Sequence, residues 1–404
     1  MIVIGAGIGG LLCASLSNNV KIFEKSEVGG RFRNLEKKGF QLTTGAVHMI
    51  PHGSKGPIAK ILKDVGANVR IVNSSPPGTF LLDKEYDYYE LLKKLNLKDK
   101  VKVPKMLYEM RSGKAPDASI EEYFERKTQT DFVIPTLRSF TGWSLSMDPR
   151  EVKAQEFFEI VKNIQRFRGP GVPIKGCSGV IDALVRVCFK KGSEIIKSEV
   201  KEILTEDNKV LGVLTDDSKE HYDDVVISDI GARETSRLCK FPKYYLKEIE
   251  KVKPSEGIKI SVSAEKRLIK HTGILFTPNC ERIDGLNQVT NVDPTLAPKG
   301  KHLVLTHQFL RSNNLREEAE LGLSDLEKLF GNRKHEILAI SSHRAKNPVN
   351  RAASGYDLDQ RTPIKGLYLV GDCAKVSGGM DVDGIALGVR KVYNYIKEDF
   401  NQKS

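Results

Sequence analysis

Apolar and polar positions alternate in short blocks at the start of the chain. Residues 1–4 form an apolar run that leads directly into the spacing G-x-G-x-x-G, made by Gly5, Gly7 and Gly10. Apolar residues then recur with helical spacing, and a second short apolar run ends at Glu24. This pattern predicts a strand, a tight turn, a helix and a second strand, in that order.

The same segment carries residues suited to holding a dinucleotide. Gly5 permits the tight turn, Gly7 lets the backbone approach a pyrophosphate, and Gly10 lets the helix pack closely on the strand. Glu24 lies where a carboxylate can accept hydrogen bonds from ribose hydroxyl groups. Because strand, glycines, helix, second strand and acid follow in order, we predict a dinucleotide-binding βαβ unit.

The pattern changes further along the chain. Helical spacing with charged faces dominates the first hundred or so residues after position 73, and a later segment mixes strands with a helix at residues 323–329. Between them, strands and helices alternate again, with a hairpin turn at Asp207 and Asn208. We therefore predict an α/β fold in which a Rossmann-like FAD-binding domain (residues 1–73, 169–238 and 344–404) contains an inserted mixed α+β substrate domain (residues 74–168 and 239–343).

Two further motifs indicate which dinucleotide binds. A double glycine at 29–30 is followed by Arg31, and a later turn contains Gly45. Near the other end of the chain, a buried-type strand closes with Gly371 and Asp372. These motifs resemble those of the FAD-dependent amine oxidases, protoporphyrinogen oxidases and phytoene desaturases, and are closest to a phytoene desaturase-like NAD(P)/FAD-dependent oxidoreductase.

The resemblance implies a bound FAD. No cysteine near the C-terminal motif matches the one by which amine oxidases attach flavin, so the FAD is expected to be noncovalent. The resemblance also implies that a helix starting near Val382 points its N-terminus at the flavin, and that the backbone of Val200 contacts adenine. The expected cofactor-binding residues are Gly5, Ala6, Gly7, Ile8, Gly9, Gly10, Phe23, Glu24, Lys25, Gly29, Gly30, Arg31, Gly45, Ala46, Val47, Val200, Ser228, Gly371, Asp372, Met380, Asp381 and Val382.

Few side chains offer acid or base chemistry, which favours hydride transfer between flavin and an apolar, isoprenoid-like substrate, as in a desaturase or saturase. His48 is the candidate catalytic residue, and a histidine bonded to the backbone beneath the ring is an equally good interpretation. Lys259 could resemble the lysine that holds water against flavin N5 in amine oxidases. A solvent-facing strand lysine is the better interpretation of Lys259.

Two other functions stay open. A flavin amine oxidase or a protoporphyrinogen oxidase-like oxidase would carry the same motifs. No aromatic pair is assignable to an amine cage, and Thr43-Thr44 replace the aspartate that many members carry two residues before the glycine matching Gly45. The second alternative is a non-enzymatic relative resembling the Rab GDP dissociation inhibitors, which bind protein and lipid. Glu24 and the Gly-Asp pair at 371–372 argue against it.

The amino-acid composition bears on whether the protein binds nucleic acid, membranes or metal ions. Lys and Arg number 64 against 52 Asp and Glu, a net charge of +12, but no dense basic run is interleaved with aromatic residues, so we expect no nucleic-acid partner. No stretch reaches the roughly 18 apolar residues of a transmembrane helix. We expect a cytoplasmic protein, peripheral on an anionic membrane at most. The six cysteines lack C-x-x-C and Cys/His ligand spacing, so we expect neither a metal site nor a disulfide framework.

Overall fold

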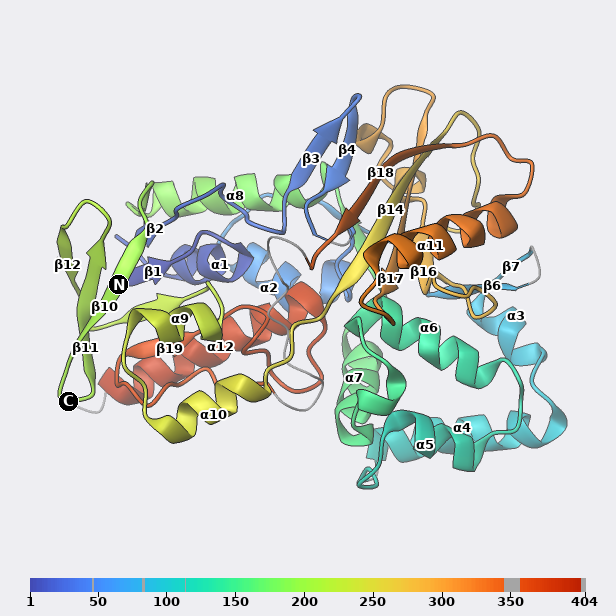
Figure 1. Ribbon diagram of the computed structural model, residues 1–404, viewed down its shortest axis with the longest axis horizontal. Coiled ribbons are helices and arrows are strands. Elements are labelled where there is room, and N and C mark those ends of the chain that lie inside the picture. Colours follow the sequence, from blue (N-terminus) through green and yellow to red (C-terminus); the bar gives the residue numbers. More distant parts are fainter. Residues whose placement is uncertain (46, 82–83, 113, 345–356, 401–404) are drawn as a thin grey trace.

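The computed structural model describes residues 1–45, 47–81, 84–112, 114–344 and 357–400. Its elements fall into two groups that lie side by side (Figure 1). One group, here called the cofactor lobe, is built on a five-stranded sheet, and the other, the substrate lobe, on a seven-stranded sheet and a set of helices. This arrangement confirms the predicted α/β class.

The sheet of the cofactor lobe has the order β19-β13-β1-β2-β9, and every neighbouring pair is parallel. Three of its strands, β1, β13 and β19, are short, fully buried and almost wholly apolar, as expected for parallel strands that are covered on both faces. The strands are β1 (Ile2–Ile4), β2 (Lys21–Phe23), β9 (Glu194–Ile196), β13 (Val226–Ser228) and β19 (Leu367–Leu369).

Four helices cover one face of this sheet and share one apolar cluster with it. Pro57 opens one of them, and Gly5 and Gly10 let another pack closely on its strand. These helices are α1 (Ile8–Leu16), α2 (Pro57–Asp64), α8 (Gly176–Lys190) and α12 (Asp381–Phe400).

The opposite face carries a three-stranded antiparallel sheet and two helices. The predicted hairpin is confirmed: Asp207 and Asn208 have φ of 47° and 58°, as a two-residue hairpin turn requires. Tyr245 and Ile249 of α10 pack into this core, although their segment was predicted to belong to the substrate domain. The elements are β10 (Val200–Glu206), β11 (Lys209–Thr215), β12 (Glu220–Tyr222), α9 (Ala232–Leu238) and α10 (Lys243–Lys251).

The sheet of the substrate lobe has the order β18-β14-β17-β16-β15-β6-β7 and is antiparallel except where β15 meets β6. Helix α11 covers one face through a cluster that includes Ile260, Leu326 and Phe330. This helix begins earlier than the predicted 323–329, because Asn314 caps it. The elements are β6 (Gly78–Leu81), β7 (Lys84–Tyr86), β14 (Gly257–Ala264), β15 (Leu275–Phe276), β16 (Gly285–Asn287), β17 (His302–Phe309), β18 (Glu336–Ser342) and α11 (Leu315–Phe330).

The helical segment predicted after residue 73 is observed beside this sheet (Figure 1). Asp87 with Glu90, and Ser119 with Glu122, form capping boxes that start two of its helices. The helices are α3 (Tyr88–Lys93), α4 (Leu97–Ser112), α5 (Ile120–Lys127), α6 (Val133–Leu145) and α7 (Ala154–Phe167). Smaller elements are β3 (Asn34–Lys37), β4 (Phe40–Thr43), β5 (Ile71–Asn73), β8 (Gly171–Pro173) and the 3-10 turns η1 (Gly53–Lys55), η2 (Pro149–Glu151), η3 (Val289–Asn291) and η4 (Pro294–Leu296).

Among the residues that the structure describes, no helix has the length and apolar character needed to cross a bilayer. All six cysteines are free thiols.

Candidate functional site

A tight loop joins β1 to α1 at the carboxyl edge of the parallel sheet. Gly5 has φ of +96°, a conformation that favours glycine, and a Cβ atom at Gly10 would overlap the carbonyl oxygen of Gly5. Helix α1 begins at Ile8, and its N-cap residue, Gly7, has no side chain with which to cap the first turn. The backbone N–H groups of this turn, which include those of Gly9 and Gly10, therefore form an anion-binding helix N-terminus.

Glu24 is held at the same edge by two backbone hydrogen bonds. Its carboxylate accepts one from the N–H of Ala6 at 2.8 Å and one from the N–H of Ser26 at 2.6 Å. The preceding residue, Phe23, packs its ring against His221 in the core, so its side chain points away from this edge. The carboxylate of Glu24 is thus oriented by the backbone of its own loop.

The double glycine folds back over the first loop. Gly29 and Gly30 both have positive φ, and the N–H of Gly29 donates to the carbonyl of Ala6 at 2.8 Å. Next to them, the guanidinium of Arg31 donates to the carboxylate of Asp372 at 2.9 Å, across 341 residues of sequence. The fold therefore brings the N-terminal and C-terminal motifs into direct contact.

The expected adenosine end lies beyond Glu24. Lys25 forms an ion pair of 3.2 Å with Glu199, the residue before Val200. A cavity of about 310 Å³ opens here, lined by Lys25, Ser26, Lys197, Ser198, Glu199 and Asp216. Val200 itself is buried at the start of β10. Its neighbour Glu199 lines the cavity, and the contact between the Val200 backbone and adenine stays a prediction.

The end of β13 contributes a residue that the sequence reasoning missed. Ser228 was expected to contact the cofactor, but its side chain is buried and its hydroxyl group bonds to that of Thr235 at 2.7 Å. The next residue, Asp229, accepts a hydrogen bond from the N–H of Gly10 at 2.8 Å. The signal that could have identified Asp229 is an acid placed directly after a buried strand, as at Glu24.

The loop around Gly45 lies against Arg31. A Cβ atom at Gly45 would come within 2.6 Å of the carbonyl oxygen of Arg31, so glycine permits the close approach. Ala46, an expected cofactor contact, lies outside the described residues. The carbonyl of Val47 accepts a weak hydrogen bond from the thiol of Cys177 at 3.8 Å.

His48 is fully buried behind this loop, and both ring nitrogens bond to the backbone. Nε2 lies 2.7 Å from the carbonyl oxygen of Gln41 and therefore donates, while Nδ1 accepts from the N–H of Cys177 at 3.2 Å. Burial lowers the pKa of His48 to about 4. The imidazole is consequently neutral at pH 7, and its donor and acceptor are both occupied.

Lys259 on β14 lies on the other side of the same loop. The expectation that it faces solvent is wrong: it is buried, and its ammonium group donates to the carbonyl and hydroxyl oxygens of Thr43 and to the carbonyl of Gly45. Burial lowers its pKa to about 7. The sequence could not show this, because the alternation of β14 does not reveal what covers each face of the strand.

The C-terminal motif ends in helix α12. This helix begins at Asp381, one residue before the predicted start, and Asp381 has a positive φ of 39°. Val382 packs among the helices of the cofactor lobe, whereas Met380 packs into the helical cluster of the substrate lobe. The motif therefore links the two lobes.

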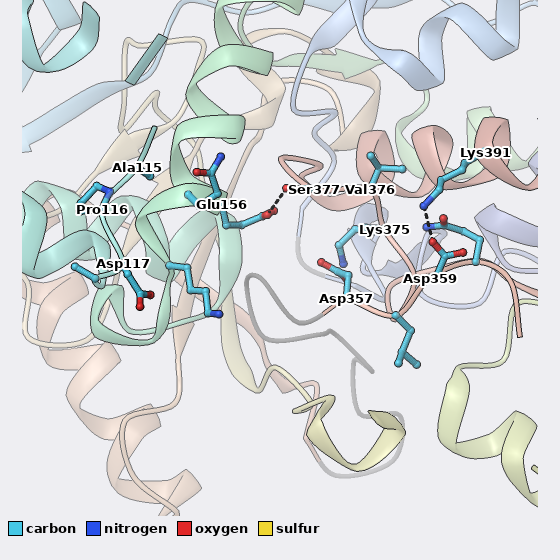
Figure 2. A pocket seen from close by; sticks show the side chains of 15 residues that line it. Ala115, Pro116, Asp117, Glu156, Asp357, Asp359, Lys375, Val376, Ser377 and Lys391 are labelled. Atoms are coloured by element: carbon cyan, nitrogen blue, oxygen red, sulfur yellow. Dashed lines mark hydrogen bonds and ion pairs between the residues drawn. The ribbon is translucent and has the colours of Figure 1, made fainter. Parts of the chain in front are cut away.

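A cavity of about 710 Å³ opens between the lobes on the outer side of this motif (Figure 2). Its lining mixes charges: Glu156 accepts hydrogen bonds from Ser377 and Gly378, and Lys391 pairs with Asp359. It is therefore not the large apolar cavity that hydride transfer to a lipophilic substrate leads us to expect, and that cavity stays a prediction.

The residues at the sheet edge fit an FAD molecule. Gly7, Gly9 and Gly371 surround the carboxyl group of Asp229 so closely that a Cβ atom at any of them would collide with it, at the point toward which the N-terminus of α1 is directed. Glu24 lies at the same edge with its carboxylate held by two backbone N–H groups, and Arg31 supplies a cation that is paired with Asp372. Across the described ranges, no group of three or more His, Cys, Asp or Glu is arranged to hold a metal ion.

Comparisons with known proteins agree with this geometry. The model of a family described as flavin containing amine oxidoreductase matches residues 9–384. An uncharacterised protein of Methanocaldococcus jannaschii is 48% identical over 401 residues, which is 98% of each chain. A crystal structure of an oxidoreductase from Methanosarcina mazei has 41% identity and a TM-score of 0.93, covering 97% of this chain and 99% of that one. Prolycopene isomerase 2 of an Oncidium hybrid cultivar is 25% identical over 77% of this chain and 64% of its own length.

Proposed function

Because this chain belongs to the flavin-containing amine oxidoreductase family, we propose that it transfers hydride between FAD and an apolar, isoprenoid-like substrate, as a desaturase or a saturase. Family membership makes the chain an FAD-dependent oxidoreductase, which favours an enzyme over a lipid- and protein-binding relative. The observation that carries the cofactor assignment is the contact between Arg31 and Asp372, which joins two separate motifs into one site.

The chain's own residues have distinct tasks in this proposal. The first turn of α1 binds the pyrophosphate, Glu24 orients the adenosine ribose, and Asp372 holds the polar chain between pyrophosphate and ring. When bound, FAD supplies the hydride-accepting atom N5. The N-terminus of α12 would favour negative charge on a ring bound in front of it, by about 1 kcal/mol from helix-dipole magnitudes. Cys373 is buried in the core, which supports noncovalent binding.

The state of His48 supports transfer without a protein acid or base. A neutral imidazole whose two nitrogens are bonded to backbone can orient the Gly45 loop, but it has no free site with which to exchange a proton with substrate. Hydride abstraction from an unactivated carbon instead needs a dry pocket that holds the C–H bond against the ring. We therefore assign His48 a positioning role.

An exposed stripe on α4 supports a lipophilic substrate and contact with a membrane. Leu97, Val101 and Tyr108 are 83%, 75% and 69% exposed, and their spacing places them on one helix face. Exposed lysines, among them Lys98 and Lys100, flank the stripe. Apolar side chains bordered by lysines are typical of helices that lie on anionic bilayers.

The acids of this helix do not offset the lysines. Asp99 is buried and accepts a hydrogen bond from Thr128 at 2.6 Å, and Glu109 pairs with Lys127 at 2.9 Å. The outward face of α4 is therefore apolar and cationic. We propose that this face rests on an anionic lipid surface, from which a lipophilic substrate enters the substrate lobe.

Co-sedimentation with phosphatidylcholine/phosphatidylserine vesicles tests this contact. The wild type should sediment at low salt and should release as the Debye length falls to about 8 Å near physiological salt. The double variant Leu97→Ser/Val101→Ser should sediment less. Tyr222→Ser, which changes a side chain that is 68% exposed on the cofactor lobe, should behave as the wild type. Absence of the wild type from the pellet at low salt would contradict the proposal.

The likeness to prolycopene isomerase further supports an isoprenoid-like substrate. The second candidate, an oxidase of amines or porphyrinogens, is favoured by the burial of Lys259 beside the Gly45 loop, because an inward-facing lysine is what a counterpart of the amine oxidase lysine requires. Anaerobic mixing of the yellow protein with isoprenoid lipids, polyamines or protoporphyrinogen separates the two. Bleaching of the flavin band by lipid alone supports the desaturase proposal, and bleaching only by an amine or porphyrinogen contradicts it.

A further inference from the structure

The carboxylate of Asp229 occupies the centre of the glycine cradle. Its oxygens would lie 2.5 Å from a Cβ atom at Gly7, 2.5 Å from one at Gly9 and 2.6 Å from one at Gly371. It also accepts the hydrogen bond from Gly10, in the first turn of α1. An acidic side chain therefore stands at the anion site of the helix N-terminus.

This position creates a conflict between two anions. The pyrophosphate carries negative charge, and a carboxylate beside it would repel it in a partly buried site. A neutral carboxyl group removes the repulsion, because it keeps an oxygen for the N–H of Gly10 and gains an O–H that donates to a phosphate oxygen. We propose that Asp229 binds the pyrophosphate of FAD as a neutral carboxyl group, so that the protein takes up one proton from solvent when the cofactor binds.

The surroundings of Asp229 favour this protonation. Burial raises its pKa to about 7, and the nearby Asp372 and Glu24 act in the same direction, while the Gly10 N–H and Arg31 oppose them. Two thiols also face it: Cys13 of α1 and Cys373 after β19 both have raised pKa values and stay neutral. Near neutral pH, the proton is therefore readily added.

The inference rests on the proposed FAD binding and adds a pH dependence to it. If only the protein with neutral Asp229 binds FAD, the affinity is nearly constant below pH 7 and falls above it, by roughly fifty-fold between pH 7 and pH 9 for a pKa near 7. The expected uptake is close to 0.9 proton per FAD at pH 8, by the same relation.

Two measurements on the whole protein test it, neither of which needs turnover. The first is the FAD dissociation constant between pH 6 and pH 9, from the fluorescence of FAD released on dilution, for the wild type and Asp229→Asn. The amide keeps an acceptor for Gly10 and a donor for phosphate but cannot titrate, so its affinity should vary less than about twofold. The second is proton uptake by the cofactor-depleted wild type, followed with a pH-indicator dye as FAD is added.

Asp284→Asn is the matched control. Asp284 is also a buried carboxyl group whose pKa is raised, to about 8, by burial, but it lies in the substrate lobe beside Arg311. This variant should retain the wild-type pH dependence. Any of three results would overturn the inference while leaving FAD binding intact. They are a wild-type FAD affinity that does not change with pH, an affinity of Asp229→Asn that changes with pH as much as that of the wild type, and an absence of proton uptake when FAD binds. Failure of the wild type to bind FAD at any pH would overturn the proposed function as well.

Discussion

Replacement of His48 by glutamine tests whether this histidine is a structural or a titrating catalytic residue. The glutamine side chain can donate to the carbonyl of Gln41 and accept from the N–H of Cys177, as the neutral imidazole does. It cannot titrate. In the wild type, burial lowers the pKa of His48 to about 4 from the ordinary value of 6.5, so the unfolded chain binds more protons than the folded chain between these pH values.

The consequence is a loss of stability in acid. A histidine with a lowered folded pKa contributes stability that is present above the unfolded pKa and is lost as the pH falls through the folded one. The 2.5-unit difference corresponds to about 3.4 kcal/mol, of which about 2.4 kcal/mol is lost between pH 7 and pH 4.5. Between pH 7 and pH 4.5, the free energy of unfolding of the wild type should therefore fall by about 2.4 kcal/mol relative to that of His48→Gln.

Urea unfolding of both proteins between pH 4.5 and pH 7 measures the difference directly. In parallel, NMR of protein with 13C-labelled histidine should show one signal, absent from His48→Gln, whose midpoint lies near pH 4. Unfolding curves that stay parallel with pH, or a midpoint near 6.5, would refute the reasoning.

Turnover by His48→Ala should fall modestly, well below the roughly 10²–10⁴-fold that accompanies loss of a general acid or base. A larger loss, together with a bell-shaped pH profile that disappears in the variant, would indicate a true acid/base role.

Two other predictions concern residues on either side of the site. Asp372→Ala should weaken FAD binding by roughly 1.5–3 kcal/mol, the range for a hydrogen bond to a charged group; an unchanged affinity, read from released-FAD fluorescence, would show that the C-terminal motif is misassigned. Burial lowers the pKa of Lys259 in the folded protein to about 7, from the ordinary 10.5. Between these pH values the unfolded chain therefore binds more protons than the folded chain. The stability of the wild type should consequently rise with pH relative to that of Lys259→Met, by up to about 1.4 kcal/mol per pH unit. Unfolding measured at pH 7 and pH 9 checks this, and a difference that is independent of pH would contradict it.

Much of the cofactor site follows from local patterns in the sequence. The turn at Gly5 and the close approach at Gly10 depend on residues near one another in the chain, and the structure contains both as predicted. Glu24 follows the second strand as predicted, and its bond to ribose stays a prediction. The hairpin at Asp207 and Asn208 has the same origin, because its turn type requires residues that tolerate positive φ. The start of helix α11 did not follow from such a pattern, because the helix begins at Leu315, eight residues before the apolar spacing that predicted it.

What the sequence alone determined is the order of strands, glycines and acids that defines the cofactor edge, because these signals come from steric limits on single residues and from short apolar periods. Only the tertiary structure decided which side chains meet there. Ser228 turns into the core while Asp229 enters the cradle, and Lys259 is buried against Thr43 from a strand more than two hundred residues away in sequence. The physical reason is that burial, and the pKa shifts that follow from it, depend on what packs against a residue from distant parts of the chain.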